Sequence, residues 1–208
     1  MTRLLLYRLP HFALLGLFSW LFLYSAWLCD DSYISFRVLQ NWDQGEGLSW
    51  NPGQRVQAFS HPSWMLLLYL AWKLHGNLFI AAIGLSFALS FGSLCFLVPK
   101  QRNGFKTGII LLPIALLLFS KGFIDYSSSG LENPLSFFLF GLLCWHTIIK
   151  KRPFSSAIYL LIAFAVLNRL DTILLILPLL LKQWIHKPAE NVKMALPGLG
   201  VMFLWFAF

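Results

Sequence analysis

Charged residues are scarce in this chain of 208 residues. Asp, Glu, Lys and Arg together make up 12% of it, whereas a soluble domain usually carries about 25%. Hydrophobic residues account for 58%. So few charges cannot solvate a globular surface of this size, and the lipid bilayer is the expected solvent for most of the chain. The composition therefore predicts an integral membrane protein.

Acidic residues are the scarcer of the two signs, with 8 against 16 basic residues and a net charge of +8. The basic residues do not form a stripe with interleaved aromatics, so we expect no nucleic-acid partner. They lie in short clusters between apolar runs, which is typical of cytoplasmic loops. The clusters are Arg3 and Arg8; Lys100, Arg102 and Lys106; Lys150 to Arg152; and Lys182, Lys187 and Lys193.

Cysteines are also few. Cys29, Cys95 and Cys144 lie in or beside apolar runs at no metal-ligand spacing, which favours small core residues in membrane helices. The first apolar run lacks a small-residue cleavage site before Asp30, so it is expected to be a retained helix. The last run, from Val201 to Phe208, has no closing polar flank. We therefore expect residues 1–208 to be the N-terminal part of a longer multi-span protein whose C-terminal remainder is absent.

Long apolar runs dominate the rest of the sequence. A spanning helix needs about 20 apolar residues, and seven runs reach or approach that length. They are 10–28, 78–98, 108–123, 134–149, 155–168, 172–185 and 194–208. The expected fold class is therefore all-α, a polytopic helical membrane protein.

The charge distribution also predicts an orientation. With the N-terminus in the cytoplasm, eleven of the sixteen basic residues fall inside and seven of the eight acidic residues fall outside. We expect a bacterial inner (plasma) membrane protein with segments 29–61, 122–133 and 168–171 on the periplasmic side. Residues 62–75 are short, and their Trp and Tyr side chains prefer the interface, so this segment is interpreted as a surface or re-entrant helix. A crossing is the alternative.

The polar outer segments carry the candidate chemistry. Asp30 and Asp31 directly follow the first helix. A carboxylate pair there can act as general base toward a hydroxyl, or hold a divalent cation such as Mg²⁺ or Mn²⁺ beside a phosphate. The alternative is that the pair only caps an amphipathic helix expected over 32–42.

Two further outer segments have similar alternatives. Ser127 to Ser129 precede Glu132 in a pattern close to a capping box, a role that is compatible with substrate binding. Arg169 either pairs with Asp171 or binds an anionic substrate group, because a guanidinium matches phosphate oxygens in a bidentate manner. Outer loops at a lipid border suit a substrate with an aliphatic tail and a polar head.

Three ordered motifs carry a resemblance to a known family. They are DDSYISFR (30–37), GEGLSWNPGQRVQAFSHPSW (45–64) and SSGLENP (128–134), and NRLD (168–171) is a weaker match. The chain resembles the polytopic glycosyltransferases of the C superfamily (GT-C) that use polyprenyl-phosphate sugars. Within that family it looks most like the mycobacterial terminal arabinofuranosyltransferases and the related pilin arabinosyltransferases. The resemblance implies amphipathic helices on the outer surface after the first span.

The resemblance also implies roles for individual residues. Asp30 and Asp31 would form the catalytic site in an outer loop at about 29–61, with Asp30 narrowly favoured as base and a metal ion possible. The implied reaction inverts the anomeric carbon and moves a sugar, arabinofuranose by resemblance, from a polyprenyl-phosphate donor to a glycan or protein acceptor beside membrane lipid. The substrate-binding candidates are Arg37, Arg55, His61, Ser128, Glu132 and Arg169. The basic residues in this set are the candidates for binding the leaving phosphate.

Two other classes remain open. A transporter or flippase component for a lipid-linked sugar would place ionisable residues near the bilayer midplane, whereas here the acids cluster in the outer loops. A structural assembly subunit would tolerate replacement of those acids. The charge pattern favours the membrane enzyme.

Overall fold

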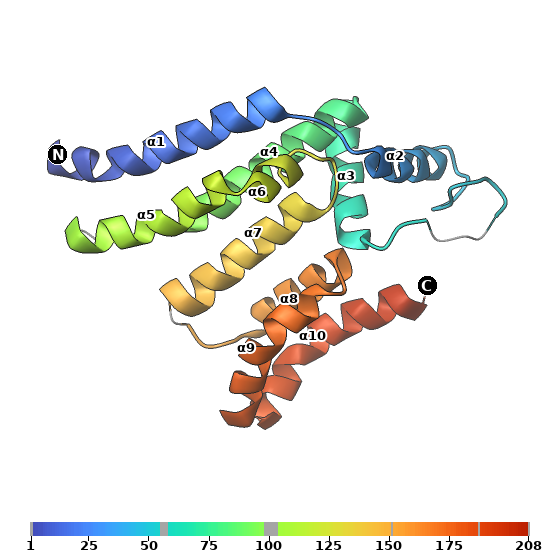
Figure 1. Cartoon of the computed structure of the whole chain (residues 1–208). Helices are drawn as coiled ribbons and strands as arrows, with labels where there is room; N and C mark the ends of the chain where they lie inside the picture. The colour runs from blue at the N-terminus through green and yellow to red at the C-terminus, as the bar shows by residue number, and fades with distance from the viewer. Residues whose placement is uncertain (1, 55–57, 98–103, 151, 187, 208) are drawn as a thin grey trace.

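The computed structural model describes residues 2–54, 58–97, 104–150, 152–186 and 188–207. The described chain is helical, with no strand in these ranges, which confirms the all-α class (Figure 1). Its elements are α1 (Thr2–Ser25), α2 (Asp30–Asp43), α3 (Pro62–His75), α4 (Leu78–Leu97), α5 (Gly104–Phe119), α6 (Lys121–Tyr126), α7 (Asn133–Cys144), the π-helical turn η1 (Trp145–Ile149), α8 (Ser156–Asn168), α9 (Thr172–His186) and α10 (Pro188–Ala207).

Helix length identifies few membrane spans. Within the described residues, α4 is the one helix that is by itself long and apolar enough to cross a bilayer. The segment Leu9–Ser25 of α1 meets the same criterion together with α2, but the pair is bent by 83°. Shorter apolar helices run over Asn133–Ile149, Ser156–Asn168 and Thr172–Ile185. A multi-span arrangement therefore stays a prediction.

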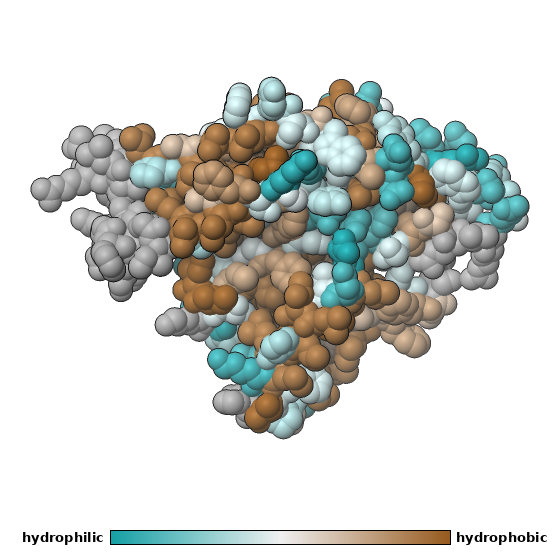
Figure 2. Space-filling model, viewed as in Figure 1, coloured by the Kyte–Doolittle hydropathy of each residue, from teal (hydrophilic) through white to brown (hydrophobic). Residues whose placement is uncertain are grey.

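The surface is apolar over much of the molecule. Phe119 of α5, Leu175 of α9 and Leu204 of α10 expose 88%, 72% and 71% of their surface. Figure 2 shows hydrophobic residues covering much of the visible face, whereas hydrophilic residues gather toward α2 and the chain that follows it. Exposed apolar patches of this kind mark contact with lipid or with other protein.

Two hydrophobic clusters form the interior. Phe18 and Phe22 of α1 pack with residues of α4, α5 and α6 in the smaller cluster. The larger cluster joins α2, α3, α4 and α7 to α10, and it includes the fully buried Trp64 of α3. One face of α3 is thus part of the protein core, and its 14 residues rise only about 21 Å.

The predicted run 108–123 is wrong as a single helix. The helix α5 ends at Phe119, and Ser120 caps a separate helix, α6, because its Oγ accepts a hydrogen bond from the backbone N–H of Phe123 at 3.3 Å. The capping-box interpretation of the following loop is also wrong. The N-cap position of α7 is Glu132 itself, and no side-chain cap bond forms there.

The last three helices are tied together by a buried polar group. The hydroxyl of Tyr159 in α8 donates to Asn191 Oδ1 in α10 at 2.8 Å, and Trp184 Nε1 in α9 donates to the Tyr159 oxygen at 3.0 Å. Gly198 of α10 lies so close to α8 that a Cβ there would be 2.7 Å from the Tyr159 carbonyl oxygen. This packing brings the end of α10, with Trp205, to the site described next.

Candidate active site

The start of α2 is fixed by the loop before α7. The chain bends by 83° between α1 and α2, and the backbone N–H of Cys29 donates to the Ser129 carbonyl at 2.8 Å. Asp30 and Asp31 occupy the first turn of α2, where the helix dipole favours carboxylates. The predicted amphipathic helix over 32–42 is confirmed, because α2 contains that range and buries one face that includes Phe36 and Leu39.

Residues 127–132 form a tightly held loop that delivers Glu132 to the site. Trp64 Nε1 donates to the Gly130 carbonyl at 3.1 Å in the interior. Gly130 has φ +76°, and a Cβ there would lie 2.7 Å from Leu28 and 2.9 Å from Ser32. Both the backbone conformation and the space therefore require glycine at this position. Ser127, in the same loop, bonds the Phe123 carbonyl at 2.6 Å.

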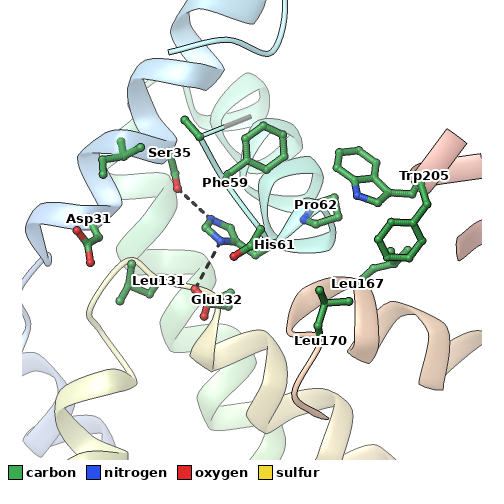
Figure 3. Close-up of a pocket in the computed structure, with 14 residues that line it drawn as sticks. Asp31, Ser35, Phe59, His61, Pro62, Leu131, Glu132, Leu167, Leu170 and Trp205 are labelled. Carbon is green, nitrogen blue, oxygen red and sulfur yellow. Dashed lines mark hydrogen bonds and ion pairs between the residues drawn. The ribbon is translucent and has the colours of Figure 1, made fainter. Parts of the chain in front are cut away.

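A cavity of about 700 Å³ opens beside the start of α2 (Figure 3). All of its polar lining residues come from α2, from the chain leading into α3 and from the loop before α7, which also contribute apolar residues, whereas the α8–α9 junction and the end of α10 contribute apolar residues alone. The polar lining residues are Asp31, Ser35, Ser60, His61 and Glu132, and the apolar ones are Ile34, Ala58, Phe59, Pro62, Leu131, Leu167, Leu170, Trp205 and Phe206. The cavity is therefore amphiphilic.

Ser35, His61 and Glu132 form a connected group among the polar lining residues (Figure 3). His61 Nε2 lies 3.0 Å from Ser35 Oγ, and His61 Nδ1 lies 3.8 Å from Glu132 Oε2. The carboxylate favours a proton on Nδ1, which leaves Nε2 to accept from the serine hydroxyl. Burial lowers the pKa of His61. The negative charge of Glu132 opposes that shift, and the positive charge of Arg169 adds to it. The imidazole is therefore neutral near pH 7.

Arg169 follows α8 and reaches the same carboxylate. Its Nη1 donates to Glu132 Oε1 at 3.2 Å, and its Nε and Nη2 donate to the two Asp171 oxygens at 3.1 and 3.0 Å. These hydrogen bonds raise the pKa of Arg169 and lower the pKa of Asp171. Asn168, the residue before Arg169, donates from its side-chain amide to the Glu132 carbonyl oxygen at 2.9 Å. The α8–α9 junction thus holds Glu132 by both its backbone and its side chain.

The structure separates the sequence-predicted residues into groups. Asp31, His61 and Glu132 line the cavity, and Arg169 contacts it through Glu132. Asp30 is exposed and is not among the lining residues. The remaining three residues lie elsewhere: Ser128 is fully buried away from the cavity, Arg37 lines a different cavity, and Arg55 lies outside the described residues.

Ser35 and Trp205 are two of the lining residues that were not among the predicted ones. Ser35 lies one helical turn after Asp31, so the i, i+4 spacing on α2 was a signal that could have found it. Trp205 comes from the last described turn of α10. No local pattern links it to α2, because only the packing of α8 against α10 brings it there.

The expected metal site has a small donor set. Among the residues that the structure describes, no group of three or more His, Cys, Asp or Glu side chains is arranged to hold a metal ion. Asp30 and Asp31 remain the candidate ligands. An Mg²⁺ ion held by one or two carboxylates usually completes its shell with water and substrate phosphate, so the metal stays a prediction.

The chain is similar in sequence to one class of enzyme. No family model matches the chain, and no solved structure matches it. The similarity that is found is to a glycosyltransferase and supports a glycosyltransferase-type function.

The relative is the terminal beta-(1->2)-arabinofuranosyltransferase of Mycobacterium tuberculosis (strain ATCC 25618 / H37Rv), which is 29% identical over 162 residues. The alignment covers 71% of this chain and 26% of the relative. The chain thus spans about a quarter of the length of the curated relative that it matches.

Proposed function

We propose that the chain is part of a multi-span membrane glycosyltransferase whose donor site is the cavity beside Asp31. The donor is a polyprenyl-phosphate sugar, arabinofuranose on the strength of the relative's name, and the acceptor is a glycan or protein hydroxyl. The active site faces the periplasm of a bacterial inner membrane, in line with the charge sorting of the loops. The exposed apolar surface supports a lipid environment.

The observation that carries this proposal is the amphiphilic cavity (Figure 3). A carboxylate, an imidazole and a second carboxylate bonded to Arg169 lie on one wall, and apolar side chains of Leu167, Leu170, Trp205 and Phe206 lie on the other. A lipid-linked sugar phosphate has the same division between a polar head and an apolar tail. Sites of this size and composition commonly bind small ligands.

Asp31 is the base in this proposal, because it lines the cavity and Asp30 does not. Its carboxylate takes the proton of the acceptor hydroxyl, whose oxygen forms a bond to the anomeric carbon. The bond from that carbon to the phosphate oxygen breaks, and its electron pair leaves with the lipid phosphate. A single displacement of this kind inverts the anomeric carbon. Arg169 supplies positive charge to the departing phosphate.

Asp30 and Asp31 are also the proposed holders of a Mg²⁺ or Mn²⁺ ion, which when bound would neutralise charge on the donor phosphate. No step described above depends on that ion. Glu132 keeps both His61 and Arg169 oriented through its two oxygens. Neutral His61 keeps its Nδ1 proton toward Glu132, so its Nε2 can accept a hydrogen bond from Ser35 or from a sugar hydroxyl without adding a charge.

The test is sugar transfer from a radiolabelled lipid donor by membranes that contain the full-length protein. Removing a positioned general base typically costs about 10²–10⁴-fold in rate. Asp31→Asn should therefore lose transfer by about that factor, with donor binding and protein abundance retained. Glu46→Gln is the control, because it removes an exposed carboxylate that does not line the cavity. Equal, normal rates in both variants would refute the enzymatic reading of α2.

A further inference from the structure

A second cavity lies on the other side of α2. It has a volume of about 530 Å³ and lies between α2, the end of α3 and the start of α4. Its lining residues are Tyr33, Phe36, Arg37, Gln40, Trp72, Gly76, Asn77, Leu78 and Phe79. It shares no lining residue with the cavity beside Asp31.

The helical geometry of α2 explains this separation. Successive residues turn by about 100° around a helix. Asp31, Ile34 and Ser35 therefore share one face, and Tyr33, Arg37 and Gln40 share the opposite face. A phosphate bound beside Asp31 and Arg169 is out of reach of Arg37, because the body of the helix lies between them.

Arg37 is presented to this second cavity with most of its donors available. Its guanidinium stacks on the ring of Trp50, with Cζ 4.5 Å from the ring centroid, and Nη2 donates to Asn51 Oδ1 at 3.4 Å. Within the described part of the chain, its other N–H groups and the Gln40 amide have no hydrogen-bond partner. Stacking fixes the guanidinium plane, so its free edge is preorganised for a ligand.

The rest of the lining consists of aromatic rings and amides. Tyr33 and Phe79 expose 52% and 53% of their surface. Trp72 and Asn77 complete the wall. Rings stack on the apolar faces of sugar rings, and amide and guanidinium groups bond to their hydroxyls. This composition fits a carbohydrate better than an isoprenoid chain.

Interactions between α2 and α3 hold the walls of this cavity at a fixed separation. Lys73 of α3 forms an ion pair with Asp43 of α2, and the hydroxyl of Tyr69 donates to Asp43 Oδ1 at 3.0 Å. The rings of Trp42 and Tyr69 lie 4.3 Å apart. These side-chain contacts fix α2 and α3 relative to one another beside the cavity.

We propose that the cavity beside Arg37 is a subsite for an acceptor glycan, on the face of α2 opposite the donor. The proposal rests on the proposed glycosyltransferase function, since it names where that reaction's acceptor chain is held. A glycan lying in this subsite would extend around the start of α2, with its terminal hydroxyl toward Asp31. Donor and acceptor would then be recognised by separate faces of one helix.

The experiment compares Arg37→Ala, Arg37→Lys and Gln40→Ala in the full-length protein, with a short arabinofuranose oligosaccharide as the probe acceptor. Loss of hydrogen bonds from a charged group should raise the acceptor KM, and the Kd of the probe measured by calorimetry without donor, by about tenfold for Arg37→Ala. Gln40→Ala should show a smaller increase. Donor affinity should stay within about twofold of normal. Lys121→Ala removes an exposed cation outside the cavity and serves as control.

The outcomes separate the two proposals. If the protein transfers sugar and the Arg37 and Gln40 variants keep the normal acceptor KM and probe Kd, the acceptor subsite is refuted while the glycosyltransferase proposal stands. If Arg37→Ala lowers only the binding of phosphatidylglycerol vesicles, the surface is a lipid contact and the subsite is likewise refuted. If no variant and no wild-type protein transfers sugar to any acceptor, the proposed function itself fails.

Discussion

The two faces of α2 differ in what surrounds their polar groups. On the Asp31 face, His61 is hydrogen-bonded to Ser35 and lies 3.8 Å from Glu132, Glu132 pairs with Arg169, and the group is half-buried among apolar side chains. On the face of Arg37, the guanidinium and amide groups are exposed and largely unbonded within the described residues. A connected, partly buried group is suited to chemistry at a fixed point, whereas an open set of donors is suited to recognition of a polymer.

The difference also shows how the two regions are built. The Asp31 face depends on residues more than 100 positions away, because Arg169 comes from the α8–α9 junction and Trp205 comes from α10. The face of Arg37 is assembled from α2, α3 and the start of α4, close together in the chain. The first region should therefore be more sensitive to long-range disruption than the second.

The largest expected effect on stability is at Gly130, which supports the Asp31 face. In Gly130→Ala the new Cβ would lie 2.7 Å from Leu28 at φ +76°, which should destabilise the protein by about 3 kcal/mol. Gly76→Ala, beside the second cavity, has φ +82° and open space, so it should cost only about 1 kcal/mol. Thermal unfolding in detergent measures both. Equal losses would show that the contact with α2 is unimportant.

Arg169 tests whether the Asp31 face binds the donor phosphate. Arg169→Lys keeps the charge but loses the bidentate geometry, so donor affinity should fall by about tenfold. Asp171→Asn is the matched control, because it breaks the exposed pair and leaves the guanidinium in place. Equilibrium binding of the labelled donor is the measurement. If both variants lose affinity equally, or if Arg169→Lys disappears from membranes, the Arg169–Asp171 pair is structural.

His61 should make the stability of the Asp31 face depend on pH just below neutrality, whereas no histidine lines the cavity beside Arg37. Burial lowers the pKa of His61 in the folded state, against the attraction of Glu132 and with the repulsion of Arg169. The folded state then binds fewer protons, so this contribution to stability is full above the unfolded pKa of about 6.5 and is lost as pH falls through the lower folded pKa. His61→Gln should weaken the pH dependence of the unfolding temperature below about pH 6.5. An unchanged acid slope in that variant would contradict this assignment.

The smallest expected effect concerns the metal. If Asp30 and Asp31 hold a divalent ion beside the donor, chelation should reduce transfer several-fold, and Mg²⁺ or Mn²⁺ should restore it. Asp30→Asn should weaken the response to added ion while leaving Asp31 as base. If chelator leaves the rate of transfer by the wild-type protein unchanged, the reaction does not use a divalent ion.

Sequence periodicity predicted most of the helices because long apolar runs have few alternatives. It failed at Ser120, where one polar residue inside an apolar run both ends α5 and caps α6. It also assigned a cap to the loop 127–129, whereas those serines bond the preceding helix and the start of α2. A short-range capping pattern does not reveal that the Ser129 carbonyl accepts a hydrogen bond from Cys29, which is far away in the sequence.

The candidate site was predictable in part. Charge sorting placed Asp31, His61, Glu132 and Arg169 on one side of the membrane, and the structure brings them together. The resemblance narrowly favoured Asp30 as base, but Asp31 and not Asp30 lines the cavity. Charge sorting also could not separate Arg37 from the other cations, because that depends on which face of α2 meets α8 and α10. Trp205 had no signal at all for the same reason.

The most direct test of the central claim is a structure of the full-length protein with a short polyprenyl-phosphate analogue. The expected result is a phosphate in the cavity beside Asp31, within hydrogen-bond distance of Arg169, with the isoprenoid chain against Leu167, Leu170 and Trp205. A phosphate bound to Arg37 on the opposite face of α2 would contradict it.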